Sequence, residues 1–212
     1  MTEPNYLERI KNNPDKAESY LNRRPSKHRS EMAMIEKAFA GLEGVKTTLD
    51  SPCGVGRATI WMAGQGYQAT GVDIGEASLA AATAQVAKLG VNATIERQDI
   101  FNMTFADRAF DAVLCFRVIH HFPEVALRAQ LIRELCRVAG KYVVLSYISP
   151  YSVISIRRKL RNKFSGRPIK NYPSTPAELD AAFASAGFER HRRVWRLPFM
   201  HSLHVVVYRR AD

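Results

Sequence analysis

Three aspartates stand at or just after the ends of successive predicted strands, where a parallel sheet binds polar ligands. Asp50 ends the first strand, Asp73 ends the second, and Asp99 follows the third. A carboxylate accepts two hydrogen bonds at once, so Asp73 suits both hydroxyls of a ribose. Asp99 suits the exocyclic amine of adenine, and Asp50 suits an ammonium group. These groups together describe S-adenosylmethionine, whereas one such aspartate alone would be an ordinary loop residue.

A turn with two glycines lies between the first predicted strand and the helix after it. It reads Asp50-Ser51-Pro52-Cys53-Gly54-Val55-Gly56. Gly54 and Gly56 allow the backbone to approach a ligand closely. The dinucleotide fingerprint GxGxxG is not met, because Thr59 stands where its third glycine belongs. Besides the three aspartates, we expect these residues to contact the cofactor: Ser51, Cys53, Gly54, Gly56, Ile74 and Ile100.

The fourth predicted strand, Phe110–Phe116, leads into residues suited to substrate chemistry. Cys115 and Phe116 are expected to line the cofactor. His120 and His121 follow beside the expected methyl position, and a histidine pKa suits a general base. We expect one histidine to act in catalysis and the other to be structural, with His120 the preferred base or substrate contact.

Arg117 belongs to the same strand end. Its guanidinium fork suits a phosphate or carboxylate of the substrate, or the carboxylate of the cofactor. The alternative is a salt bridge across the edge of the sheet.

The three cysteines, Cys53, Cys115 and Cys136, form neither a disulfide framework nor a metal-binding knuckle. No Cys–His–acid arrangement indicates a covalent nucleophile. Methyl transfer from a sulfonium needs mainly alignment and desolvation. We therefore predict a metal-independent reaction in a reducing, cytoplasmic setting.

Strand-like and helix-like segments alternate along the chain. Strands are predicted at 45–49, 67–72, 93–97, 110–116 and 142–147, and helices at 58–63, 77–89 and 125–138. This alternation is typical of an α/β fold whose parallel sheet has helices on both faces.

The last third of the chain breaks this alternation. Thr175-Pro176-Ala177-Glu178 predicts a capped helix that stops at Gly187. Strands at 188–197 and 203–210 follow, and the short connection between them cannot hold a crossover helix. They must form an antiparallel hairpin.

The composition fits one globular domain over residues 1–212. Hydrophobic residues make up 46% of the chain and charged residues 24%, which excludes a disordered chain. No apolar run is long enough for a membrane span, and the polar start has no secretion signal. Helices are expected before residue 45, where Met32, Ile35, Phe39 and Leu42 recur at helical spacing. Tyr20 and Arg24 of this region are candidates for closing over the cofactor.

The formal net charge of +11 is concentrated in the last third of the chain. Tyr151–Ala177 carries seven lysines and arginines and no acid, which favours an anionic partner. Within this basic insertion (148–175), the spacing of Val153, Ile156, Leu160 and Phe164 predicts one apolar helix face. The remaining surface carries Arg157, Arg158, Arg161 and Lys163.

Such a helix can lie on an anionic membrane interface. The alternatives are a substrate lid whose apolar face packs on the domain and a solvated basic surface. We predict that Arg157, Arg158 and Arg161 bind substrate.

From about Val45 to Arg210 the sequence resembles the class I S-adenosylmethionine-dependent methyltransferases. LDSPCGVGR is similar to their first motif, GVDIGEASL to the second, RQDI to the adenine-side motif, and FDAVLCFRVIHHF to the fourth-strand motif. The resemblance implies a Rossmann-like, doubly wound sheet of seven strands, mostly parallel with the last one reversed. Pro52 departs from the usual glycine. The Asn/Asp-Pro-Pro-aromatic motif is absent, which argues against N-methylation of DNA bases.

DxPCGxGR, FRxxHHF and the basic insertion together resemble bacterial methyltransferases of lipopolysaccharide core or envelope glycolipid assembly. This implies O-methylation of a small or lipid-linked anionic acceptor, with a peripheral position at the inner face of the membrane. Two alternatives stay open. VIHHF is similar to tRNA wobble-uridine enzymes, which favours an RNA substrate. Arg157 and Arg161 resemble one arm of cyclic-dinucleotide binders, which favours a regulatory module. The sequence specifies neither the methylated atom nor the oligomeric state.

Overall fold

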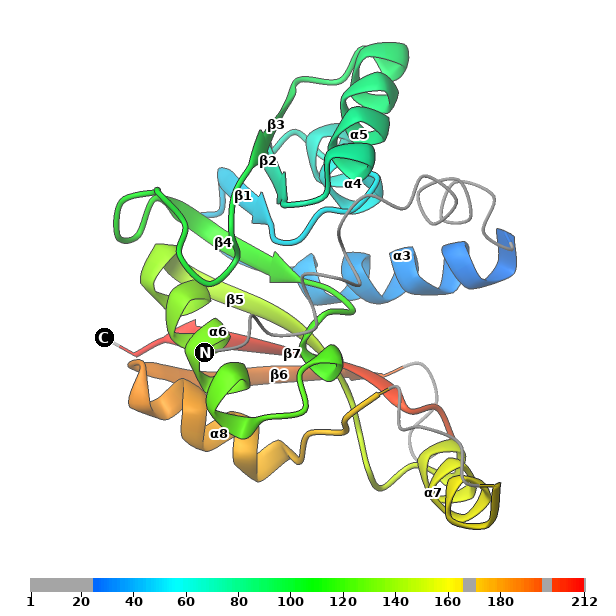
Figure 1. Cartoon of the computed structure of the whole chain (residues 1–212). Helices are drawn as coiled ribbons and strands as arrows, with labels where there is room; N and C mark the ends of the chain where they lie inside the picture. Colours follow the sequence, from blue (N-terminus) through cyan, green and yellow to red (C-terminus); the bar gives the residue numbers. More distant parts are fainter. Residues whose placement is uncertain (1–24, 166–170, 196–199, 212) are drawn as a thin grey trace.

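The computed structural model describes residues 25–165, 171–195 and 200–211, and it contains one seven-stranded sheet (Figure 1). In chain order the elements are α3 (Pro25–Phe39), β1 (Thr47–Asp50), α4 (Arg57–Gly64), β2 (Gln68–Asp73), α5 (Glu76–Leu89), β3 (Ala93–Arg97), β4 (Phe110–Cys115), η1 (Ile119–His121), α6 (Val125–Val138), β5 (Ala139–Ile148), α7 (Val153–Ser165), α8 (Pro176–Ser185), β6 (Phe188–Trp195) and β7 (Leu203–Arg210).

The strand order is β3-β2-β1-β4-β5-β7-β6. β7 runs antiparallel to both β5 and β6, and the other described pairings are parallel. The predicted fold class and the reversed last strand are thus confirmed. In a sheet that extends both ways from β1 and β4, the carboxyl ends of these two strands mark the expected ligand site.

Helices cover both faces of the sheet. On one face, α3 and α4 pack against the central strands through Met34, Ile35, Phe39, Met62, Leu114, Val144 and Val207. On the other face, α6 and α8 bury Leu131, Leu135, Leu179 and Phe183 against Val113, Val143 and Tyr208. The rings of Phe183 and Tyr208 stack with centroids 3.6 Å apart. Figure 1 shows α7 at one end of the sheet, apart from these helices.

Several element boundaries differ from the predicted ones. β1 begins at Thr47 rather than residue 45, and the N–H groups of Lys46 and Thr47 at its start donate to the carboxylate of Asp111 on β4 at 2.8 and 3.0 Å. α3 ends at Phe39, so Leu42 lies beyond the helix. β5 is longer than predicted and reaches Ile148.

The predicted helix cap is confirmed: Thr175 Oγ1 accepts the N–H of Glu178 at 3.1 Å, and Pro176 begins α8. Tyr20 and Arg24 lie outside the described residues, as do the side chains of Lys163 and Phe164. In the described parts of the chain, no helix has the length and apolar character needed to cross a membrane.

Candidate active site

Asp50 closes the end of β1 with a buried carboxylate. The backbone N–H and the hydroxyl of Thr59 both donate to its Oδ2, at 3.0 and 2.8 Å. Burial raises the pKa of Asp50 to about 7, although the two bonds from Thr59 favour the charged form. Both of these bonds use the same oxygen, which leaves Oδ1 for an ammonium group of a ligand. That role stays a prediction.

The glycine turn has the backbone that its sequence predicts. Gly54 and Gly56 have φ angles of 54° and 77°, in the left-handed region that favours glycine. A Cβ on Gly56 would lie 3.0 Å from the Cβ of Ala82, whereas one on Gly54 would meet nothing within 4 Å. The turn is therefore open at Gly54. Pro52 does not need a positive φ, because only Arg108 and Arg117 have one among the described non-glycine residues.

Asp73 joins this turn to the end of β2. Its Oδ2 accepts the N–H of Gly54 and its Oδ1 accepts the N–H of Gly75, both at 2.9 Å. Burial raises the pKa of Asp73, and the backbone donors oppose that shift. The carboxylate is thus fixed at the position where the sequence predicts a ribose.

Asp99 lies at the end of β3, half-buried, and its Oδ1 accepts the N–H of Phe101 at 2.9 Å. The N–H of Gln98 donates to the backbone oxygen of Asp73 at 3.1 Å, which holds the ends of β2 and β3 together. Ile74 is half-buried and Ile100 is buried. The structure therefore brings the three predicted acids to one edge, and their ligand contacts stay predictions.

The end of β4 lies against the glycine turn, because the N–H of Ser51 donates to the backbone oxygen of Leu114 at 2.9 Å. Cys115 is fully buried, and Phe116 is half-buried. All three cysteines are free and buried. Burial raises the pKa of the Cys53 and Cys115 thiols, so both are neutral at physiological pH. They are suited to line a site rather than to attack a substrate.

Arg117 forms the salt bridge that the sequence offered as the alternative to ligand binding. Its Nη1 donates to Oε1 of buried Glu31 on α3 at 2.5 Å. Its φ is 64°, which is uncommon for a residue with a Cβ, and its N–H donates to Ser146 Oγ at 2.6 Å. Glu31 escaped sequence reasoning because it lies 86 residues away in the chain and belongs to no local motif.

His120 and His121 belong to a short 3-10 helix that the sequence did not predict. Their ring centroids are 4.4 Å apart. His120 is buried, and its Nδ1 has no hydrogen-bond partner among the described residues. Burial lowers the pKa of His120 to about 3, and electrostatic interactions with His121 and Arg158 act in the same direction. His120 is therefore neutral at pH 7.

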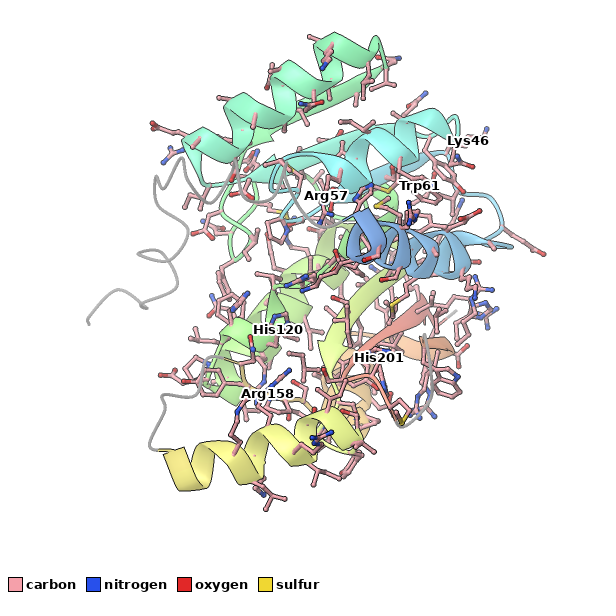
Figure 2. The ribbon with its side chains drawn as sticks, turned by 90° about the vertical axis from the view of Figure 1, so that its right-hand side faces the viewer. Lys46, Arg57, Trp61, His120, Arg158 and His201 are labelled. Atoms are coloured by element: carbon pink, nitrogen blue, oxygen red, sulfur yellow. The ribbon has the colours of Figure 1, made fainter. Side chains whose placement is uncertain are left out.

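The basic insertion begins and ends beside this histidine pair. The N–H of Tyr172 donates to the backbone oxygen of His120 at 2.8 Å, and the N–H of Ser174 donates to that of Ile148 at 3.0 Å. Figure 2 shows Arg158 on the side of α7 that faces His120. Arg157 and Arg161 are exposed, and no described contact brings them to His120. Of the three predicted substrate arginines, the structure thus places Arg158 near the histidines.

The apolar face of α7 does not pack on the domain in the described part of the helix. Val153, Ile156 and Leu160 are 43, 50 and 54% exposed. The helix is anchored instead by small polar residues: Ser155 Oγ donates to the backbone oxygen of Ser149 at 2.6 Å. The alternative of a lid with a packed apolar face is therefore wrong for these three residues.

The residues at this edge fit S-adenosylmethionine. Asp73 and Asp99 suit the hydroxyls and the amine of an adenosine, Asp50 suits an ammonium, and the backbone at Gly54 is open to a close approach. In the described residues no three His, Cys, Asp or Glu side chains gather as metal ligands, and independence from metals stays a prediction. A doubly wound sheet with this strand order and this site defines a Rossmann-like nucleoside-binding domain.

Comparisons with known proteins identify the family to which the domain is similar. Residues 48–141 match the family model described as a methyltransferase domain. Over 159 residues the chain is 35% identical to the ubiquinone biosynthesis O-methyltransferase of Pseudomonas paraeruginosa, covering 71% of this chain and 67% of that protein. The Psychrobacter arcticus protein of the same name is 32% identical, over 72% of this chain and 62% of the relative. The chain thus spans less than two thirds of the length of the Psychrobacter relative.

The fold has a solved counterpart in the magnesium protoporphyrin IX methyltransferase of Synechocystis with bound SAH. That structure matches with a TM-score of 0.74 at 19% identity, over 87% of this chain and 84% of the other. The chain belongs to the class I S-adenosylmethionine-dependent methyltransferases. At the level of the family, the predictions of an enzyme and of S-adenosylmethionine as its cofactor are confirmed.

Proposed function

We propose that this protein methylates a hydroxyl oxygen of an anionic small or lipid-linked acceptor, with His120 and Arg158 holding that acceptor. The observation that carries the proposal is the buried Nδ1 of His120, which has no partner among the described residues, in a ring close enough to Arg158 for its charge to lower the pKa of His120. Buried polar atoms are rarely left unpaired in proteins, so such an atom suits a missing ligand.

When bound, the cofactor supplies an activated methyl group. Asp50, Asp73 and Asp99 would hold the cofactor. The neutral imidazole of His120 accepts the hydrogen bond of the acceptor hydroxyl at Nδ1, orients its oxygen and takes up the proton that the hydroxyl loses when it is methylated. An acceptor anion on Arg158 offsets the positive charge that helps to lower the pKa of His120. Anionic acceptors are therefore the ones for which His120 becomes a stronger base.

Two classes of acceptor agree with these requirements. The basic insertion and the motifs DxPCGxGR and FRxxHHF favour an envelope glycolipid or lipopolysaccharide precursor. The relatives named as ubiquinone biosynthesis O-methyltransferases favour a hydroxylated quinone precursor. Both classes of acceptor are lipid-linked, and in both the nucleophile is a hydroxyl oxygen.

The test is conversion of S-adenosylmethionine to S-adenosylhomocysteine by the purified full chain with extracted glycolipid fractions and with polyprenyl hydroxybenzoates. We expect turnover with one class that falls at least about tenfold in Arg158→Gln. The matched control is Lys159→Gln on the same helix, which is exposed and should retain activity. Turnover with transfer RNA and with no other acceptor would replace this proposal with that of an RNA methyltransferase. Binding of a cyclic dinucleotide without turnover on any acceptor would replace it with that of a regulatory module.

The same proposal places the protein at an anionic membrane surface. Exposed Ile156 and Leu160 lie on a helix whose other described side chains include Arg157, Lys159 and Arg161. An exposed apolar face bordered by arginines can insert at the lipid boundary while the guanidinium groups meet anionic headgroups.

Co-sedimentation with vesicles tests this placement. We expect binding to vesicles rich in phosphatidylglycerol, little binding to pure phosphatidylcholine, and loss of binding in the double variant Ile156→Asn/Leu160→Asn. Leu89→Asn is the control, because Leu89 is equally exposed (56%) but lies at the end of α5. Equal sedimentation of the double variant and the wild type would reject α7 as the contact.

A further inference from the structure

We infer that Glu31 is a positioning residue for the amino-acid end of the cofactor, acting through two arginines. Glu31 lies on α3 and is only 3% exposed. Its Oε1 accepts from Arg117 Nη1 at 2.5 Å, and its Oε2 accepts from Arg57 Nη2 at 3.4 Å. One buried carboxylate thus joins α3 to the segments that follow β1 and β4.

Both arginines belong to segments that follow the strand ends at the expected cofactor position. Arg57 follows Gly56 at the start of α4, and Arg117 follows Phe116 after β4. The ends of β1 and β4 are themselves joined by the hydrogen bond from Ser51 to Leu114. Figure 2 shows Arg57 beside the N-terminal half of α3.

The order of the strands decides which part of the cofactor these arginines meet. In the sequence β3-β2-β1-β4, the adenine is assigned to Asp99 at β3 and the ribose to Asp73 at β2. The amino-acid end then falls at β1 and β4, where its carboxylate needs a cation. This step rests on the cofactor placement of the proposed function.

Glu31 uses only part of what the arginines offer. A guanidinium group has five N–H donors, and Glu31 takes one from each arginine, while His28 Nδ1 lies 2.9 Å from Arg57 Nη1. The side chains of Arg57 and Arg117 remain 23 and 25% exposed. Without the carboxylate, two cations would repel each other at this edge, and their forks would lose a fixed orientation.

Calorimetry with two ligands separates positioning from mere structural support. S-adenosylhomocysteine carries the amino-acid end, and 5′-methylthioadenosine lacks it. In Glu31→Gln we expect the affinity for S-adenosylhomocysteine to fall at least about tenfold, with the affinity for 5′-methylthioadenosine changed less than about twofold. Glu36→Gln, an exposed acid on the same helix, should change neither.

Arg117→Gln supplies a second variant should Glu31→Gln fail to fold, and we expect the same selective loss from it. The double variant should lose no more than either single variant, because the acid and the arginine act as one unit. If folded Glu31→Gln and Arg117→Gln bind S-adenosylhomocysteine as the wild type does, the inference is wrong while the proposed function stands. If the wild type binds neither ligand, the cofactor placement fails and this inference fails with it.

Discussion

Thr59 donates two hydrogen bonds to one oxygen of Asp50, from its backbone N–H at 3.0 Å and from its hydroxyl at 2.8 Å. A threonine at this place fastens the first turn of α4 to the end of β1, where dinucleotide-binding turns have a glycine. The buried carboxylate is thereby fixed beside the open backbone of Gly54. The turn is held by side-chain hydrogen bonds as well as by glycine conformations.

Gly71 keeps the space that this pair needs. A Cβ at Gly71 would lie 2.6 Å from Thr59 Oγ1 and 3.0 Å from the Cβ of Cys53. We expect Gly71→Ala to lower the free energy of unfolding by about 1–3 kcal/mol and to weaken S-adenosylhomocysteine binding. Gly64→Ala is the control in denaturant unfolding, since its Cβ meets nothing and it should be neutral or slightly stabilising. Equal unfolding midpoints for the two variants would contradict this account.

The raised pKa of Asp50 makes the free energy of unfolding depend on pH. Burial moves that pKa from 3.8 in the unfolded chain to about 7 in the folded chain, so the folded state binds the proton more tightly. The contribution of Asp50 to stability is therefore greatest at low pH and falls as pH rises from about 4 to about 7, by at most about 1.4 kcal/mol per pH unit. Asp50→Asn should remove this fall. The measurement is the free energy of unfolding in urea of the wild type and of Asp50→Asn, compared across that pH range.

Cofactor binding should depend on pH in the opposite sense. The ammonium group assigned to Asp50 favours the charged carboxylate, so the affinity for S-adenosylhomocysteine should rise with pH up to about 7 and then level off. Calorimetry in two buffers of different ionisation enthalpy should detect proton release on binding near pH 6. A pH-independent affinity in the wild type would show that Asp50 serves only the turn.

The sequence predicts the exact bounds of those helices and strands whose hydrophobic patterns have clear ends. β3 at Ala93–Arg97, α6 at Val125–Val138 and β7 at Leu203–Arg210 have the predicted bounds. The acids at the strand ends could be predicted as a set, because parallel strands bring their carboxyl ends to one edge of the sheet.

The features that sequence reasoning missed depend on contacts between distant parts of the chain. Nothing near Glu31 in the sequence indicates a partner 86 residues away, and the left-handed backbone of Arg117 depends on Ser146 of β5. The amphipathic pattern at Val153, Ile156 and Leu160 predicts the helix that the structure has as α7. Whether its apolar face packs on the domain depends on tertiary structure, which periodicity does not encode.

Arg128 of α6 makes another long-range contact, with Glu178, and it also supports the backbone directly after the histidine pair. It is buried, and its Nη1 donates to the backbone oxygens of Phe122 and Pro123 at 2.8 and 3.0 Å, while its Nε donates to Glu178 at 2.7 Å. We expect Arg128→Met to lower the free energy of unfolding by about 3 kcal/mol, because these acceptors lose their donor.

Methyl transfer should fall in Arg128→Met even where the protein is folded, since η1 loses its support. Arg133→Met is the control: Arg133 is exposed on the same helix, so its unfolding midpoint and turnover should match those of the wild type. Wild-type turnover in folded Arg128→Met would show that the histidines do not depend on this arginine.

The most direct test of the cofactor site is a calorimetric titration of S-adenosylhomocysteine into wild type, Asp73→Ala and Glu76→Ala. Asp73 bridges Gly54 and Gly75 at the end of β2, whereas Glu76 is exposed three residues further on. We predict micromolar binding to the wild type and to Glu76→Ala, and a loss of about 100-fold or more in Asp73→Ala, because two ribose hydroxyls lose a charged acceptor. Wild-type affinity in a folded Asp73→Ala protein would contradict the account.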